Sequence, residues 1–150
     1  MKDAVHVVCP QCEAVNRVDG NRMGQGPKCG RCSAPLFSGR PVSVTASAFE
    51  KHVSRSHVPV VVDFWAPWCG PCRMMAPAFE SAARHLEPHV RFLKVNTEEE
   101  PALASRYAIR SIPTVVIFRR GKELARRSGA MDASELQRWI HDAALSGYQS

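Results

Sequence analysis

The spacing of hydrophobic and polar positions changes near residue 42 of this 150-residue chain. The first 41 residues hold four cysteines and five glycines and show little helical periodicity. From residue 42 onward, β-branched runs alternate with stretches whose apolar residues recur every three to four positions. This alternation predicts an α/β segment with a mixed central sheet that is covered by helices on both faces.

The second segment predicts elements in the order βαβαβαββα. Strands are expected at 41–44, 59–65 and 90–96, a hairpin at 114–128, and helices at 45–55, 71–87, 99–108 and 132–145. The run "PVVVDFW" is apolar on both sides, as in a strand buried on both faces. Ser47 and Glu50 have capping-box spacing, and so do Asp132 and Glu135. Acidic residues are expected in the first turn of the third helix, and the hairpin should turn at Arg120–Gly121.

The first segment is too small to sustain a fold on a hydrophobic core alone, and "LFSGRPV" reads as a turn and linker. We therefore predict a small metal-binding module at 1–38, an α/β domain at 39–147 and a disordered tail at 148–150.

The net charge of +6 comes with no basic run interleaved with aromatic residues, so nucleic-acid binding is not expected. No apolar run is long enough for a membrane span or a secretory signal, and we expect a cytoplasmic protein with no membrane partner.

Four of the six cysteines form two C-x-x-C pairs, Cys9/Cys12 and Cys29/Cys32, separated by sixteen residues. Each pair can grip one ion from a tight turn, and together they predict a four-thiolate Zn²⁺ site of the zinc-ribbon type. Such a site would supply the folding energy that the segment lacks. The alternative, two structural disulfides, requires an oxidising compartment. The zinc site is either structural or an oxidation sensor that releases metal when its thiols form disulfides.

The third pair, Cys69 and Cys72, lies between a buried strand and a long helix and has no second pair. A helix N-terminus favours thiolate over thiol, so Cys69 should be a nucleophile near neutral pH and Cys72 the resolving thiol. The alternative for a lone C-x-x-C is a metal half-site or two core cysteines.

The run "FWAPWCGPC" resembles the active-site signature of the thioredoxin family, and "SIPT" and "SGA" match further along the chain. With "CPQC", "CGRC" and "LFSG" ahead of it, the whole resembles the bacterial thioredoxin 2 subgroup, which carries an N-terminal zinc ribbon. The resemblance implies a thioredoxin fold. It also implies that Asp63 accepts the proton of Cys72, that Lys94 pairs with Asp63, and that Pro113 follows a cis bond. The substrate-binding surface it implies consists of Trp68, Gly70, Pro71, Ile112, Pro113, Gly129 and Ala130.

These features predict a protein-disulfide reductase that uses a Cys69/Cys72 dithiol–disulfide cycle and no organic cofactor. The resemblance implies disulfide-containing client proteins and an NADPH-dependent thioredoxin reductase as partners, and we expect a monomer. One alternative is a disulfide isomerase or oxidant, but those families usually carry His in place of Pro71. A second alternative is a binding module in which the thioredoxin fold is only a scaffold.

Overall fold

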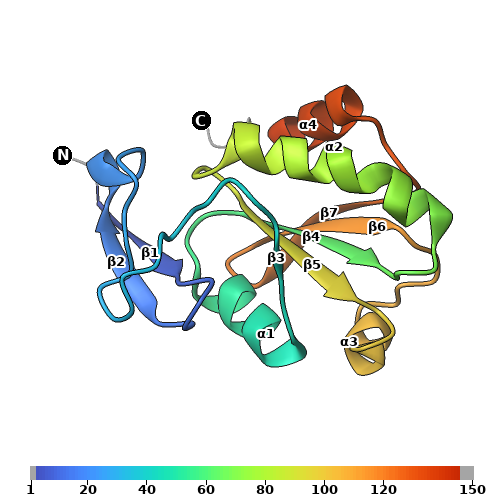
Figure 1. Ribbon diagram of the computed structural model, residues 1–150, viewed down its shortest axis with the longest axis horizontal. Helices are drawn as coiled ribbons and strands as arrows, with labels where there is room; N and C mark the ends of the chain where they lie inside the picture. Colours follow the sequence, from blue (N-terminus) through green and yellow to red (C-terminus); the bar gives the residue numbers. More distant parts are fainter. Residues whose placement is uncertain (1–2, 146–150) are drawn as a thin grey trace.

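A computed structural model of the chain describes residues 3–145 and contains two separate sheets (Figure 1). The first is an antiparallel hairpin of β1 (Ala4–Val8) and β2 (Val15–Asp19), followed by a 3-10 turn, η1 (Gly20–Arg22). Its small core contains Val7, Leu36 and two cysteines, Cys9 and Cys29. We call the segment from β1 to Phe37 the ribbon.

The second sheet has five strands in the order β3-β5-β4-β6-β7. Its strands are β3 (Val42–Ser43), β4 (Val60–Trp65), β5 (Arg91–Asn96), β6 (Thr114–Arg119) and β7 (Lys122–Ser128). The helices are α1 (Ala46–Arg55), α2 (Gly70–Leu86), α3 (Pro101–Arg106) and α4 (Ala133–Ile140), which continues as a π-helical segment, η2 (His141–Leu145). The predicted order of elements and the mixed sheet are confirmed: β4 runs parallel to β5 and antiparallel to β6.

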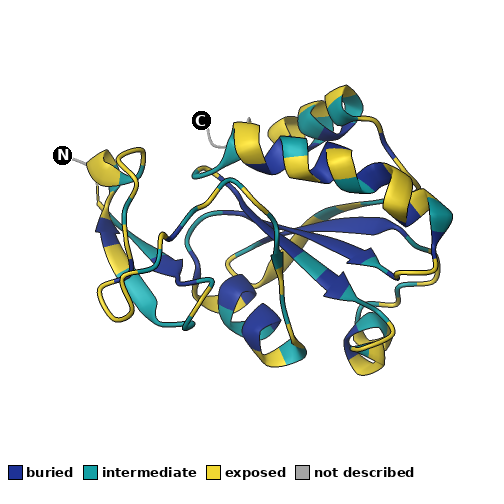
Figure 2. Cartoon of the chain, viewed as in Figure 1, coloured by how far each residue is buried: buried dark blue, intermediate teal, exposed yellow. Residues whose placement is uncertain are grey.

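Helices cover both faces of this sheet, and its central strands are buried (Figures 1 and 2). Val61 of β4 packs with α2 and α4, whereas Val60, Val62 and Phe64 pack with α1 and α3. This alternation explains why β4 has an unbroken apolar run. Asp63 follows the same alternation and therefore lies on the face that α2 covers.

The β6–β7 hairpin turns at Arg120 and Gly121, as predicted. Both residues have positive φ, 49° and 84°, as expected for a type I′ turn whose twist matches the strands it joins. The Asp132 cap of α4 is also confirmed, since its Oδ1 accepts a hydrogen bond from the Glu135 N–H at 2.8 Å.

Two local predictions are wrong. The N-cap of α1 is Thr45, whose Oγ1 accepts from the Ala48 N–H, and Glu50 instead pairs with Arg106. The first turn of α3 contains no acidic residue, because the helix begins at Pro101, a residue whose fixed φ suits the first helical position.

The ribbon packs beside the sheet at the end where α2 finishes and β5 begins (Figure 1). The His57 N–H donates to the His6 carbonyl at 2.9 Å, and the His6 N–H donates to Nδ1 of His57 at 3.1 Å. The two imidazole rings stack with centroids 4.3 Å apart. The ribbon is therefore fixed against the larger sheet.

Within residues 3–145, no helix is long and apolar enough to cross a membrane. The predicted tail at 148–150 and the predicted end of the α/β domain at residue 147 lie outside the described residues. The division at residue 38 stays a prediction.

Candidate active site and metal centre

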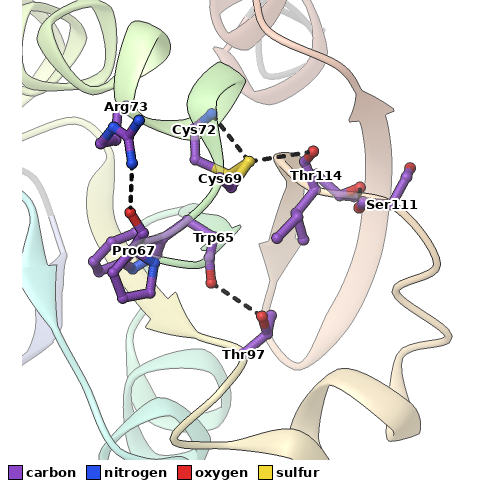
Figure 3. The surroundings of a disulfide bond; sticks show 9 residues. Trp65, Pro67, Cys69, Cys72, Arg73, Thr97, Ser111 and Thr114 are labelled. Carbon is purple, nitrogen blue, oxygen red and sulfur yellow. Dashed lines mark hydrogen bonds between the residues drawn. A yellow bond between two sulfur atoms is a disulfide. The ribbon is translucent and has the colours of Figure 1, made fainter.

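Cys69 is the N-cap residue of α2, and its Sγ accepts a hydrogen bond from the Cys72 N–H at 3.2 Å (Figure 3). Gly70 and Pro71 form the first turn of the helix, where a proline needs no backbone donor. Cys69 and Cys72 form a disulfide across this turn. The loop from β4 therefore delivers Cys69 to the position where unpaired amides and the helix dipole favour a thiolate.

The two sulfurs lie in an apolar setting with Trp65, Ala66 and Ile112. Cys69 is only 4% exposed, whereas the neighbouring Trp68 is 65% exposed. A large apolar side chain thus stands in solvent beside a nearly enclosed cysteine. This arrangement suits an active site that a macromolecular substrate must cover.

A second loop faces the disulfide. The Ile112–Pro113 bond is cis, and the Ile112 carbonyl oxygen lies 3.7 Å from Cys69 Sγ. The Gly129 N–H donates to the Pro113 carbonyl at 2.9 Å, so the segment after β7 lies against this loop. Among the predicted substrate-binding residues, four are exposed, two are half-buried and one is buried. The exposed ones are Trp68, Pro71, Gly129 and Ala130; Gly70 and Ile112 are half-buried, and Pro113 is buried.

Asp63 lies beneath the dithiol face of the sheet and is 1% exposed. Neither of its carboxylate oxygens has a hydrogen-bond partner among the described residues. Burial raises the pKa of Asp63 to about 7, against an opposing attraction from Lys94. Lys94 is its register partner on β5, and the Lys94 Nζ lies 4.4 Å from the centroid of the Trp65 ring. The two side chains predicted to pair therefore share one face of adjacent strands.

Two residues that the sequence reasoning missed hold the loops in place (Figure 3). Arg73 Nη1 donates to the Pro67 carbonyl at 2.9 Å, which ties the loop before Cys69 back to α2. Thr114 Oγ1 donates to the Ser111 carbonyl at 2.6 Å and lies 3.1 Å from Ser128 Oγ, which braces the loop around Pro113. A signal was available for Thr114, since it is the only uncharged polar residue of β6, whose other residues are apolar apart from Arg119 at its end.

The predicted metal ligands come together in the ribbon. The Sγ atoms of all four cysteines, Cys9, Cys12, Cys29 and Cys32, lie within 4.8 Å of one another. Two cross-pair distances, Cys9 to Cys32 and Cys12 to Cys29, are 3.6 Å. A tetrahedral ion with metal–sulfur bonds of about 2.3 Å requires sulfurs about 3.8 Å apart. The quartet therefore fits one tetrahedral, thiolate-bound ion.

Backbone amides point at the ribbon sulfurs, as expected where C-x-x-C turns wrap a metal ion. Cys9 Sγ accepts from the N–H groups of Gln11 and Cys12, and Cys29 Sγ accepts from the Arg31 N–H. The Asn16 amide also donates to Cys29 Sγ. This bond, together with the backbone bonds from Cys32 and Arg31, lowers the pKa of Cys29 to about 6. A bond from the Ala34 backbone lowers the pKa of Cys32, but partial desolvation and the three neighbouring thiols outweigh it and raise that pKa to about 12. Four crowded thiols resist joint ionisation unless a cation balances the charge.

Residues 40–142 match the family model described as thioredoxin, which is more than half of the chain. The chain belongs to the thioredoxin family. Residues 8–34 match a second model, described as the N-terminal part of thioredoxin 2, and this match contains all four ribbon cysteines.

Named thioredoxins resemble the chain over most of their own length. Thioredoxin C-3 of Corynebacterium nephridii is 42% identical over 134 residues, which cover 89% of this chain and 92% of that protein. Thioredoxin 1 of a Nostoc species is 50% identical over 97 residues, 65% of this chain and 91% of that one. A solved thioredoxin from Malassezia sympodialis superposes with a TM-score of 0.65 at 35% identity, covering 71% of this chain and 93% of its own.

Thioredoxins are thiol–disulfide oxidoreductases, and so is this protein. The thioredoxin fold preceded by a four-cysteine ribbon is confirmed. The ribbon match and the cysteine cluster together indicate a metal-binding module.

Proposed function

We propose that the chain is a cytoplasmic protein-disulfide reductase that cycles through the Cys69/Cys72 dithiol and carries one zinc ion in its ribbon. The observation that carries the proposal is the position of Cys69, at the N-cap of α2 and bonded to Cys72 across the first turn. That position favours a thiolate that has its resolving partner already within reach.

The cycle consists of two thiol–disulfide exchanges. The Cys69 thiolate attacks one sulfur of a client disulfide, which forms a mixed disulfide and releases the other client sulfur as a thiolate. Cys72 then loses its proton to Asp63 and attacks Cys69 Sγ, which releases the second client thiol and leaves the Cys69–Cys72 disulfide. The client gains two electrons and the dithiol loses two. The pKa of Asp63, raised to about 7 by burial, suits a group that accepts and returns a proton near neutral pH. Lys94 supplies the nearby positive charge that partly offsets the cost of ionising this buried carboxyl.

Clients dock across the surface formed by Trp68, Gly70, Pro71, Ile112, Pro113, Gly129 and Ala130. Burial of Cys69 beside an exposed Trp68 supports a partner that covers this surface and excludes water. An extended client segment can pair with the backbone beside Pro113, a β-strand-addition contact.

We propose that the ion is Zn²⁺ and that its role in the ribbon is structural. Four thiolates in a tetrahedron are typical of structural zinc sites, which leave no open coordination position. The dithiol stands at the N-terminus of α2, and the ribbon packs beside the sheet at the end where α2 finishes (Figure 1). A helix of 17 residues spans about 25 Å. This separation argues against direct exchange between the two sets of sulfurs within one chain.

An NADPH-dependent thioredoxin reductase is the proposed electron donor, and the chain is proposed to act as a monomer.

The reductase proposal is tested by insulin-disulfide reduction with the wild type, Cys69→Ser and Cys72→Ser. We expect the wild type to reduce insulin and Cys69→Ser to lose the activity. Cys72→Ser should instead accumulate a mixed disulfide that runs as a larger species on a non-reducing gel. Equal reduction by the wild type and Cys69→Ser would favour the alternative, a binding module on a thioredoxin scaffold.

The zinc proposal is tested by metal analysis combined with thiol counting under native conditions. We expect one zinc per chain, four protected thiols and two thiols that cycle. Titration with peroxide in the presence of a zinc-sensitive dye separates the two roles of the metal. Zinc that is kept until denaturation indicates a structural site, and zinc released stoichiometrically with thiol loss indicates a redox sensor.

A further inference from the structure

Arg91, the first residue of β5, is buried at the junction between the ribbon and the thioredoxin sheet. The residue is 1% exposed. Its Nη2 donates to two ribbon carbonyls, that of Val8 at 3.0 Å and that of Leu36 at 2.7 Å. One guanidinium of the redox domain thus binds the ribbon both at its first strand and at its last residues.

The charge of Arg91 is held by further contacts at the same junction. Its Nη1 lies 3.8 Å from Glu87 Oε2, and its guanidinium carbon lies 4.3 Å from the centroid of the Phe37 ring. The other carboxylate oxygen of Glu87 accepts from the Gly39 N–H at 2.8 Å, in the linker between the two modules. A buried charge is costly to leave without a partner, so Arg91 depends on the ribbon staying in place.

The two ribbon residues that Arg91 binds, Val8 and Leu36, both adjoin proposed metal ligands. Val8 precedes Cys9, and Leu36 packs with Cys9 and Cys29 in the ribbon core. Four thiolates around a divalent ion carry a net charge of about −2. A cation enclosed beside Cys9 offsets part of that charge in a region shielded from solvent. Burial lowers the pKa of Arg91 only to about 10, so the guanidinium is charged at neutral pH.

We propose that Arg91 is a positioning residue of the metal centre: its hydrogen bonds to the Val8 and Leu36 carbonyls hold the backbone beside Cys9, and so couple metal retention to the stability of the thioredoxin sheet. The inference rests on the proposed metal binding of the ribbon. Because coupling between two sites is reciprocal, the metal stabilises the α2–β5 junction as much as the junction stabilises the metal.

The test measures the rate at which zinc-loaded full-length protein transfers zinc to a chromophoric chelator. Wild type is compared with Arg91→Met, Arg91→Lys and Arg138→Met. The last variant removes an exposed arginine from α4 and serves as the matched control. Loss of a group that hydrogen-bonds a metal ligand typically weakens metal binding by roughly 10- to 100-fold. Arg91 acts one bond further out, through the Val8 and Leu36 carbonyls, so we expect Arg91→Met to release zinc faster by about 10-fold, the lower end of that range. Arg91→Lys should be intermediate and Arg138→Met unchanged. Equal release by wild type and a folded Arg91→Met variant would overturn the proposal.

A second measurement needs no variant and applies even if Arg91→Met fails to fold. Amide hydrogen exchange is followed in wild-type protein with zinc and after chelation. We expect chelation to accelerate exchange at the amides of Gly39, His57 and Arg91, and to leave the β6–β7 hairpin protected. Exchange that rises only within the ribbon would refute the coupling. A purified chain that binds no stoichiometric zinc would instead refute the proposed metal centre itself.

Discussion

At the scale of single residues, the chemistry depends on placing charge where water is scarce. The carboxylate of Asp63 is enclosed under α2 and meets no hydrogen-bond donor among the described residues. Its ionised form is therefore disfavoured in the folded protein, and Lys94 offsets that penalty only in part. The buried carboxyl therefore lowers the free energy of unfolding at neutral pH, and its raised pKa lets it hold a proton there.

Replacing Asp63 with asparagine should stabilise the protein above pH 7 and slow the reductase. The folded pKa of about 7 lies above the unfolded value of 3.8, so the native state loses stability as pH rises from about 4 to about 7. The substituted amide carries no ionisable proton, and the advantage of Asp63→Asn at pH 8 should approach about 4 kcal/mol, at 1.36 kcal/mol per pKa unit. Urea unfolding of both proteins at pH 4 and pH 8 measures this difference. An advantage of equal size at both pH values would contradict the raised pKa.

At the scale of elements, short side chains decide where helices begin. Thr45 Oγ1 caps α1 at 3.4 Å from the Ala48 nitrogen, whereas Ser47 lies exposed inside the first turn. Both residue types favour N-caps, and both occur near the start of the same predicted helix. The capping-box spacing of Ser47 and Glu50 predicted Ser47 as the N-cap. That prediction is wrong, because the Glu50 side chain forms an ion pair with Arg106 on α3 instead of completing a capping box.

Thr45→Ala should lower the free energy of unfolding by about 1 kcal/mol, the usual cost of losing an N-cap. Ser47→Ala is the matched control two residues away. It should change stability by less than about 0.5 kcal/mol, because it removes an exposed hydroxyl that caps nothing. Chemical denaturation of the two variants beside wild type measures both effects. The reverse ranking would restore Ser47 as the cap.

Elements with a strong local pattern could be predicted from the sequence, and contacts between distant segments could not. The apolar run of β4, the turn at Arg120–Gly121 and the Asp132 cap each depend on neighbours a few residues away. The two metal pairs and Cys69 at a strand-to-helix turn were predictable for the same reason. Arg91 binds carbonyls 83 and 55 residues away, and no local pattern marks that partnership. The only signal was a charged residue at the start of an apolar strand.

At the scale of the whole molecule, the redox site and the metal site share one framework but occupy opposite ends of it (Figure 1). The dithiol stands at the N-terminus of α2, while the ribbon is bound where α2 ends and β5 begins. The proposed clients can therefore reach Cys69 at the end of α2 that lies away from the ribbon. The ribbon can influence the redox domain through stability, by way of Arg91 and Glu87, rather than by contact with substrate.

Two of the buried titratable groups, His52 and Asp63, should contribute opposing pH dependences to the free energy of unfolding. His52 on α1 is 1% exposed, and burial together with nearby Arg91 lowers its pKa to about 3. Because the folded pKa of His52 lies below its unfolded value of 6.5, the unfolded state binds the proton more readily. The free energy of unfolding therefore decreases as pH falls below 6.5. Asp63 acts in the opposite sense, because acidification removes its buried charge.

Between pH 8 and pH 5 the contributions of His52 and Asp63 should partly offset each other in wild type, and each variant should show one of them alone. At pH 5 the His52 contribution is a loss of about 2 kcal/mol, so His52→Gln should gain that much on wild type between the two pH values. Asp63→Asn should give up about 3 kcal/mol of its advantage over the same range.

Comparison of each variant with wild type cancels groups that titrate alike in all of them, the ribbon thiols included. The double variant should equal the sum of the two single effects, since the groups lie on opposite faces of the sheet. Denaturation curves at pH 5, 6.5 and 8 measure these differences, and parallel pH profiles for wild type and His52→Gln would show that His52 is not held neutral by burial.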